Sequence, residues 1–204
     1  MAKATHLVGP RLGINALVDG ELVEAIGVLE LDSIARGYDT ADAMMKEAPV
    51  ALVDSSPVSS GKYVILIAGD PASVESSVKR GVLVGGTAVI DHLLLTLVHA
   101  QVLPAIRGIR EVARVDALGV VETRSVASAI RAADAAAKAA CVELLHVRLA
   151  MSIGGKGVVT LTGRHPDTIA AVEAGADAAR QSGMLLATAI IARPHFATDK
   201  TVLG

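Results

Sequence analysis

The chain has 204 residues, of which 52% are hydrophobic, and a formal net charge of −2 at pH 7. With two Tyr, one Phe and no Trp, it offers neither the aromatic platforms nor the basic groove that bind single-stranded nucleic acid, which argues against a nucleic-acid partner. Cys141 is the only cysteine, so an intrachain disulfide and a cluster held by several cysteines of one chain are excluded. Residues 1–20 lack the apolar core of a signal peptide, and the longest uncharged run, residues 93–106, is too short to span a bilayer. We therefore expect a cytoplasmic protein with no membrane partner.

One stretch of the sequence occurs twice. Residues 25–53 and 117–145 align without a gap at a shift of 92 residues and share 13 identities. After the next loop the shift becomes 94, so the second copy has gained two residues there. This tandem duplication predicts an N-terminal extension at 1–24, a first domain at 25–114 and a second domain at 115–204. Because domains of this size bury only about two thirds of their surface, each should pack against the other domain or against a neighbouring chain.

The first copy predicts two helices among four strands. The extension before it, rich in Gly and Pro, is either a flexible arm or an extra strand laid on a neighbour. In the first helix, Asp39 is expected to be the cap and Pro49 the stop, because Ala41, Met44 and Ala48 fall on one helical face. The remaining elements are strands at 25–31, 50–54 and 62–68, a polar loop at 55–61, a helix from the Asp70-Pro71 cap to residue 85, a strand region at 87–98, and a helix or linker at 102–114.

The second copy repeats this order. Its predicted elements are strands at 117–122, 142–149, 157–162 and 184–192, helices at 131–140 and 166–180, and a glycine-rich loop at 152–156. Each copy is therefore β-α-β-β-α-β, the order of ferredoxin-like folds. We predict an α+β protein of two tandem domains, each with two helices on one face of a small antiparallel sheet.

Two patterns resemble motifs of catalysis or ligand binding, but neither is complete. The Gly-Lys pairs at 61–62 and 155–156 lack the other residues of a phosphate loop, so a strand-to-strand turn is favoured. The six histidines show no metal-ligand spacing, and neither GxSxG nor HExxH occurs. No catalytic residue and no metal ligand is predicted.

Two duplicated charges remain. Glu30 and Glu122 stand at equivalent places in strands and could form an acid–base pair, but their duplication favours a structural role, such as accepting backbone or hydroxyl hydrogen bonds at a subunit contact. Lys46 and Lys138 lie near the ends of equivalent helices, where a cation complements the helix dipole.

The stretches GVLELDSIARGYDTADAMMKEAPVALV and GVVETRSVASAIRAADAAAKAACVELL resemble the opening of the bacterial microcompartment (BMC) shell domain, with its strand, its A-D-A-x-x-K helix and its following strand. The Gly-Lys pairs and the segment Arg193-Pro194-His195 are also similar to that family. The resemblance covers residues 25–201 in unpermuted order, and within the family it points to the tandem-domain trimer class, as in propanediol-utilisation compartments.

The resemblance implies a structural role without catalysis. Three tandem chains would form a flat pseudohexameric homotrimer, a tile that joins edge to edge with copies of itself and with other shell proteins, both hexamers and pentamers, in the shell of a cytoplasmic microcompartment. It assigns the tile edge to Lys46 and Lys138 and to a second element formed by Arg193, Pro194 and His195. The first copy has His99-Ala100-Gln101 in place of that element, so alternate edges would differ chemically.

The resemblance also assigns a central pore for small polar metabolites. Its lining would consist of Val58, Ser59, Ser60 and Gly61 from the first copy and Ser152, Ile153, Gly154 and Gly155 from the second. In the propanediol-type relative a cysteine at the place of Ser59 ligates an iron–sulfur cluster; a serine hydroxyl is a poor substitute for a thiolate, so we expect no cofactor. Cys141 lies elsewhere, and we expect a small buried thiol there.

Two alternatives remain open at this stage. One, within the family, is a gated, double-stacked tandem shell protein with a larger, closable pore. The other is a trimeric ferredoxin-like ligand-binding or regulatory protein that holds a small anion with the same loops.

Overall fold

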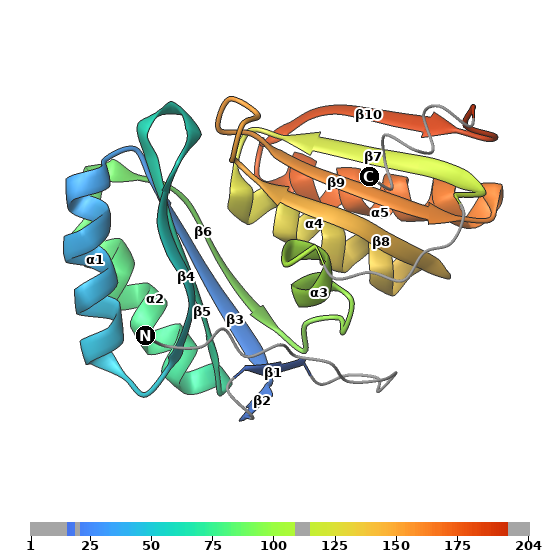
Figure 1. Ribbon diagram of the computed structural model, residues 1–204. Helices are drawn as coiled ribbons and strands as arrows, with labels where there is room; N and C mark the ends of the chain where they lie inside the picture. The colour runs from blue at the N-terminus through green and yellow to red at the C-terminus, as the bar shows by residue number, and fades with distance from the viewer. Residues whose placement is uncertain (1–15, 19–20, 109–114, 196–204) are drawn as a thin grey trace.

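The computed structural model describes residues 16–18, 21–108 and 115–195. They form two α+β units side by side, each with a four-stranded antiparallel sheet (Figure 1). Ahead of the first unit, β1 (Ala16–Val18) and β2 (Glu21–Val23) pair as a short antiparallel hairpin. Of the predicted extension, residues 1–15 and 19–20 lie outside the described residues.

The first domain has the predicted β-α-β-β-α-β order. Its elements are β3 (Ala25–Leu31), α1 (Ile34–Glu47), β4 (Ala51–Val58), β5 (Lys62–Gly69), α2 (Pro71–Gly85) and β6 (Val89–Thr96), with short 3₁₀ turns at Ser59–Gly61 and Gly86–Ala88. The strands are ordered β4-β5-β3-β6, so β3 and β5 are central and β4 and β6 are edges. A short helix, α3 (Val102–Ile106), follows where the sequence left a helix or linker open.

The second domain repeats this arrangement. Its elements are β7 (Ala117–Thr123), α4 (Val126–Ala139), β8 (Val142–Leu149), β9 (Gly157–Gly163), α5 (His165–Gln181) and β10 (Leu185–Ile191). The strand order β10-β7-β9-β8 is that of the first domain, and every pairing is antiparallel. The predicted fold class is therefore confirmed in both copies.

Helices cover one face of each sheet. In the first domain, Leu29, Ile65 and Ile67 point to α1 and α2 and pack with Met44 in one buried cluster. A glycine at the middle of the first strand of each copy lets the second helix approach: a Cβ on Gly27 would meet Val78, and one on Gly119 would meet Val172 at 2.6 Å. The identity of these two glycines in the repeat thus reflects helix-to-sheet packing.

Three expectations for the first half of each copy were wrong. Helix α1 begins at Ile34, because Ser33 caps it by accepting the Arg36 N–H, whereas Asp39 lies inside the helix and pairs with Arg36. Helix α4 likewise begins at Val126 instead of residue 131. The residues expected as a polar loop at 55–58 continue β4 and pair with β5, which an edge strand with a proline permits.

The second face of the first sheet is covered by the other domain. Because side chains alternate along a strand, Ile26 and Val28 of β3 point away from α1 and α2. They are fully buried in a cluster that also contains Val126 and Ile130 of α4. In Figure 1, α4 accordingly lies between β6 of the first domain and the sheet of the second. One apolar cluster therefore extends across both domains.

Candidate functional site

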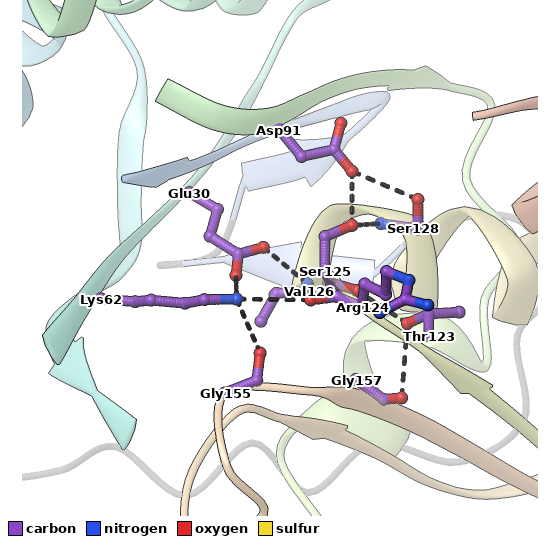
Figure 2. A network of polar contacts seen from close by, with 10 residues as sticks. All are labelled: Glu30, Lys62, Asp91, Thr123, Arg124, Ser125, Val126, Ser128, Gly155 and Gly157. Atoms are coloured by element: carbon purple, nitrogen blue, oxygen red, sulfur yellow. Dashed lines mark hydrogen bonds and ion pairs between the residues drawn. The ribbon is translucent and has the colours of Figure 1, made fainter. Parts of the chain in front are cut away.

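The most buried charge of the described chain lies where the two domains meet. Glu30, on β3, has a side chain that is 0% exposed. Its Oε1 accepts a hydrogen bond from Lys62 Nζ at 2.8 Å, and its Oε2 accepts one from the backbone N–H of Val126 at 2.7 Å (Figure 2). Val126 is the first residue of α4, so the carboxylate satisfies one of the free N–H groups at a helix N-terminus, where negative charge is favoured.

Lys62 joins this carboxylate to the second domain. Besides Glu30, its ammonium donates to the backbone oxygens of Gly155 at 2.9 Å and Arg124 at 3.3 Å, which uses its three donors. The side chain is 18% exposed. Burial raises the pKa of the Glu30 carboxyl above its ordinary value of 4.5, and the hydrogen bond and charge of Lys62 act in the opposite direction. The ion pair is thus a desolvated link between two domains.

A second carboxylate supports the same helix end. Asp91, on β6, accepts hydrogen bonds from the hydroxyls of Ser125 at 2.5 Å and Ser128 at 3.2 Å (Figure 2). Ser125 is also the cap of α4, since its Oγ accepts the N–H of Ser128 at 3.1 Å. Glu30 and Asp91, both on the first domain, therefore hold the first turn of α4.

Residues that follow β6 hold the far end of the contact. The backbone N–H of His99 donates to Asp134 at 2.8 Å, and Asp134 also accepts from Lys138 at 2.6 Å. Gln101 donates to the oxygen of Val142 at 3.0 Å and accepts the N–H of Leu144 at 2.7 Å, which clamps the edge of β8. Burial lowers the pKa of the His99 imidazole, while the charge of Asp134 opposes the shift.

We call this surface the domain joint. It comprises Glu30, Lys62, Asp91, His99 and Gln101 of the first domain and Arg124, Ser125, Val126, Ser128, Asp134, Val142, Leu144 and Gly155 of the second.

The two predicted pore loops, residues 58–61 and 152–155, meet at one end of the joint. Ser59 Oγ accepts the backbone N–H of Ser152 at 2.8 Å, and Lys62, next to the first loop, bonds to Gly155 in the second. Ser60 and Ser152 both have positive φ, at 65° and 60°, a conformation that non-glycine residues rarely adopt. The remaining residues predicted for the pore are Val58, Gly61, Ile153 and Gly154; the two glycines are exposed and the other two half-buried.

The predicted edge residues lie in three places. Lys46 and Lys138 end α1 and α4 and pair with Asp42 and Asp134 one helical turn back, both at 2.6 Å. His99 lies in the domain joint beside Lys138, through their shared partner Asp134. Arg193 and His195 are exposed and Pro194 is half-buried just after β10.

The structure assigns roles that the sequence left open. The structural interpretation of Glu30 is confirmed, since it accepts a backbone N–H across a domain boundary, although the boundary lies within one chain. The Gly-Lys pairs are turns, as predicted, but their lysines form ion pairs with the strand glutamates, Lys62 with Glu30 and Lys156 with Glu122. Asp91 and Gln101 were missed because nothing in their local sequence marks a contact with a distant segment.

Cys141 lies in a different environment from the one expected. Cys141 is exposed, so the expectation of a buried thiol was wrong: it lies at the turn before β8. Among the residues that the structure describes, no three His, Cys, Asp or Glu side chains gather as a metal site would require. The described helices include none that is both long enough and apolar enough to cross a membrane.

Two tandem βαββαβ units joined in this way define a duplicated α+β protein whose copies pack side by side. The BMC domain family matches this chain twice, at residues 25–101 and 117–194. The chain therefore belongs to the BMC domain family and carries two such domains in tandem, which confirms the family resemblance of the sequence.

Known proteins agree with this assignment. The chain is 41% identical to the bacterial microcompartment shell protein PduT of Citrobacter freundii over 84% of this chain and 94% of that protein. It is 30% identical to the carboxysome assembly protein CcmO of Synechococcus elongatus over 83% of this chain and 65% of the relative. Among solved structures, a microcompartment protein from Desulfitobacterium hafniense superposes with a TM-score of 0.78 and 45% identity, covering 86% of this chain and 98% of that one. The chain is thus a tandem-domain shell protein of the bacterial microcompartment type.

Proposed function

We propose that this chain is a non-enzymatic tile: a homotrimer with six domains around a ring that assembles edge to edge, with copies of itself and with hexameric and pentameric shell proteins, into a microcompartment shell in the cytoplasm. One observation carries the proposal, the direction of the domain joint. Ser59 and Ser152 meet at one end of it, and Lys138 lies at the other end beside His99. Two sectors of a ring need this arrangement, with loops towards the axis and edge residues at the rim.

The pore loops support passage of small polar molecules through the centre of the tile. The first loop brings two serine hydroxyls and the second brings Ser152 and exposed backbone groups. Such groups donate and accept hydrogen bonds without fixed charge, which suits neutral polar or weakly anionic solutes. Ser59 already accepts a hydrogen bond from the second loop, so a structural role for its hydroxyl fits better than a role as cluster ligand.

The edge assignment is tested by imaging arrays. Purified protein at increasing concentration, examined by electron microscopy, should show hexagonal particles that pack into flat arrays or closed shells. Changing both Lys46 and Lys138 to Ala should abolish the arrays and leave the trimers. Lys79→Ala is the matched control, because Lys79 is as exposed as Lys46 and also pairs with a carboxylate one turn back at 2.6 Å.

Two outcomes would contradict the proposal. If the double lysine variant no longer forms trimers, these lysines act within the ring and the edge assignment is wrong. If the unmodified chain forms trimers that never make arrays at any salt concentration, a ligand-binding or regulatory role at the pore loops becomes the better explanation.

A further inference from the structure

The two pore loops differ in how their own sheets hold them. In the first domain, the pairing of β4 with β5 continues up to Lys62, which leaves only residues 59–61 as a 3₁₀ turn between the strands. In the second domain, the pairing of β8 with β9 ends at Leu149 and Gly157, which leaves residues 150–156. The first loop is therefore fixed by its sheet, whereas the second contains a longer unpaired segment.

The second loop has an unfavourable backbone conformation. Ala150 and Ser152 have φ of 61° and 60°, in the left-handed region that non-glycine residues rarely adopt. A bond of 3.0 Å from the Ala150 N–H to the Lys156 oxygen closes the base of the loop. The bonds across its tip, from Ile153 to the Ala150 oxygen and from Lys156 to the Ile153 oxygen, are longer, both 3.4 Å. Such a conformation persists only where the surrounding structure holds it.

The first domain supplies the contacts that hold this tip. Ser59 Oγ accepts the Ser152 N–H at 2.8 Å, and Lys62 Nζ donates to the Gly155 oxygen at 2.9 Å, so both bonds are shorter than those within the tip. The loops also pack together at Gly155, where an added Cβ would lie 3.2 Å from the Ser59 oxygen and 3.3 Å from Lys62 Cε. We call these the loop contacts; all of them cross from the first domain to the second.

Lys62 is itself fixed by the interior of the domain joint. Its Nζ binds the fully buried carboxylate of Glu30 at 2.8 Å and the backbone oxygen of Arg124 at 3.3 Å. Figure 2 shows the side chain reaching from β5 to a point between Glu30 and Gly155. Because this ammonium cannot move away without leaving a buried carboxylate unpaired, the position of Gly155 is coupled to the interior of the joint.

Resting on the proposed tile, we infer that Ser59 and Lys62 are positioning residues that set the width of the pore, because they hold the second loop in one conformation. The first loop is the fixed part of the lining, and the second loop, with the exposed side chain of Met151, is the part that moves when the loop contacts are removed. Neither residues 58–61 nor residues 150–155 include a charged side chain. The pore therefore selects small polar solutes by size, and the loop contacts set the limit.

Spin labels at the tip of the second loop test this inference. In a background with Cys141→Ser, which removes the exposed native thiol, Met151→Cys carries a nitroxide; Met151 is 58% exposed, so the label needs no space in the core. Pulsed dipolar electron paramagnetic resonance then measures the distances between the labels across the axis of the trimer. We expect one narrow distribution. Ser59→Ala should broaden it and increase the mobility of the label, because the Ser152 N–H loses its acceptor, and Ser59→Thr, which keeps the hydroxyl, should restore it.

Hydrogen exchange of the Ser152 amide is a second measurement, and it needs no label. Ser59→Ala should speed this exchange about fivefold or more, the factor expected for the loss of one hydrogen bond. Ser59→Thr should bring the rate back. Ser60→Ala is the matched control, because it removes a hydroxyl of the same loop that takes no part in the loop contacts.

A pair of glycine variants separates the loop contacts from strain of the backbone itself. Gly154 and Gly155 have φ of 66° and 76°, so alanine is strained at both. An added Cβ meets nothing within 4 Å at Gly154 but meets the first loop at Gly155. Gly155→Ala should therefore broaden the distances between labels as Ser59→Ala does, and Gly154→Ala should leave them narrow. Lys62→Met, measured where circular dichroism shows a folded chain, should also broaden them, and Lys79→Met should not.

The outcomes distinguish this inference from the proposed function. A chain that does not form trimers would overturn the tile, while the exchange of Ser152 would still test the loop contacts, which lie within one chain. Trimers in which Ser59→Ala changes neither the label distances nor the exchange rate would leave the tile standing and refute the role of Ser59. An effect of Ser59→Ala that Ser59→Thr does not reverse would refute it as well, because the hydroxyl would then not be the group that holds the loop.

Discussion

Removal of the cation at the domain joint, by Lys62→Met, is predicted to destabilise the chain in a manner that depends on pH. Methionine keeps the length and most of the apolar surface of the lysine stem, so the change removes mainly the charge. It leaves the fully buried carboxylate of Glu30 with the N–H of Val126 as its remaining partner. Breaking a buried ion pair from one side costs about 3–5 kcal/mol of unfolding free energy.

Protonation of Glu30 sets an upper limit on this cost. A carboxyl with an ordinary pKa of 4.5 can be neutralised at pH 7 for about 3.4 kcal/mol, since each pH unit is worth about 1.36 kcal/mol. We therefore expect a loss of about 3 kcal/mol at pH 7. At pH 5 neutralisation costs only about 0.7 kcal/mol by the same conversion, so the loss should fall to about 1 kcal/mol.

The direction of this pH dependence follows from linkage. Burial raises the pKa of Glu30 in the folded state, so the folded chain binds more protons than the unfolded chain at pH values from 4.5 up to the raised pKa. The unfolding free energy therefore falls as pH rises through that window. Lys62 opposes the shift, so its removal raises the pKa further and extends the window upwards. The deficit of the variant relative to the unmodified chain should accordingly grow from pH 5 to pH 8.

Urea unfolding followed by far-ultraviolet circular dichroism measures these differences, because the chain has no tryptophan to report by fluorescence. Lys79→Met is the control: its ion pair with Glu75 is exposed, and its loss should change the unfolding free energy by less than about 0.5 kcal/mol. A deficit below about 0.5 kcal/mol at pH 7, or one that is equal at pH 5 and pH 8, would refute the account of Glu30 as a desolvated charge held by Lys62.

Three other changes have expected outcomes. Gly37→Ala should lower the unfolding free energy by about 2 kcal/mol or more, because the added Cβ would overlap the ring of buried Tyr63; a thermal midpoint unchanged within error would contradict this packing. Gln101→Ala should lower it by about 1–3 kcal/mol by freeing the backbone groups of Val142 and Leu144, and hydrogen exchange of the β8 amides should quicken while that of β9 stays the same. Ser59→Cys should let the trimer gain a brown iron–sulfur chromophore under anaerobic reconstitution, and an intact trimer that stays colourless would show that residue 59 does not lie on the axis.

The repeat and the strand patterns predicted the fold, but the local boundaries were harder. The start of α1 was placed too late because Asp39 is as good a cap as Ser33 by residue type. The spacing of Ile34, Tyr38 and Ala41 would have extended the helix, yet Gly37 interrupts it with a poor helix former. That glycine is present because the ring of Tyr63 packs against it, and no local pattern can show a contact of that kind.

The domain joint itself could be anticipated only in part. Glu30 and Glu122 stood out because duplication placed the same charge twice in an otherwise apolar strand. Asp91 and Gln101 gave no such signal, since their partners lie 34 to 43 residues further along the chain. In the second copy, the residue opposite Glu122 is Ala187, where the first copy has Asp91 opposite Glu30. The internal repeat therefore cannot predict the role of a residue that forms its contact in one copy only.

This asymmetry between copies bears on how a ring could close. The covalent link between the domains already gives them a high effective concentration, so the contacts of Asp91 do not have to supply affinity. They are directional: with the Glu30 contact they fix the first turn of α4 relative to the first sheet, while Gln101 fixes the edge of β8. A ring closes only if every joint turns by the same angle. A chain that sets this angle rigidly inside itself would bring to the proposed tile one joint that is already at the correct angle.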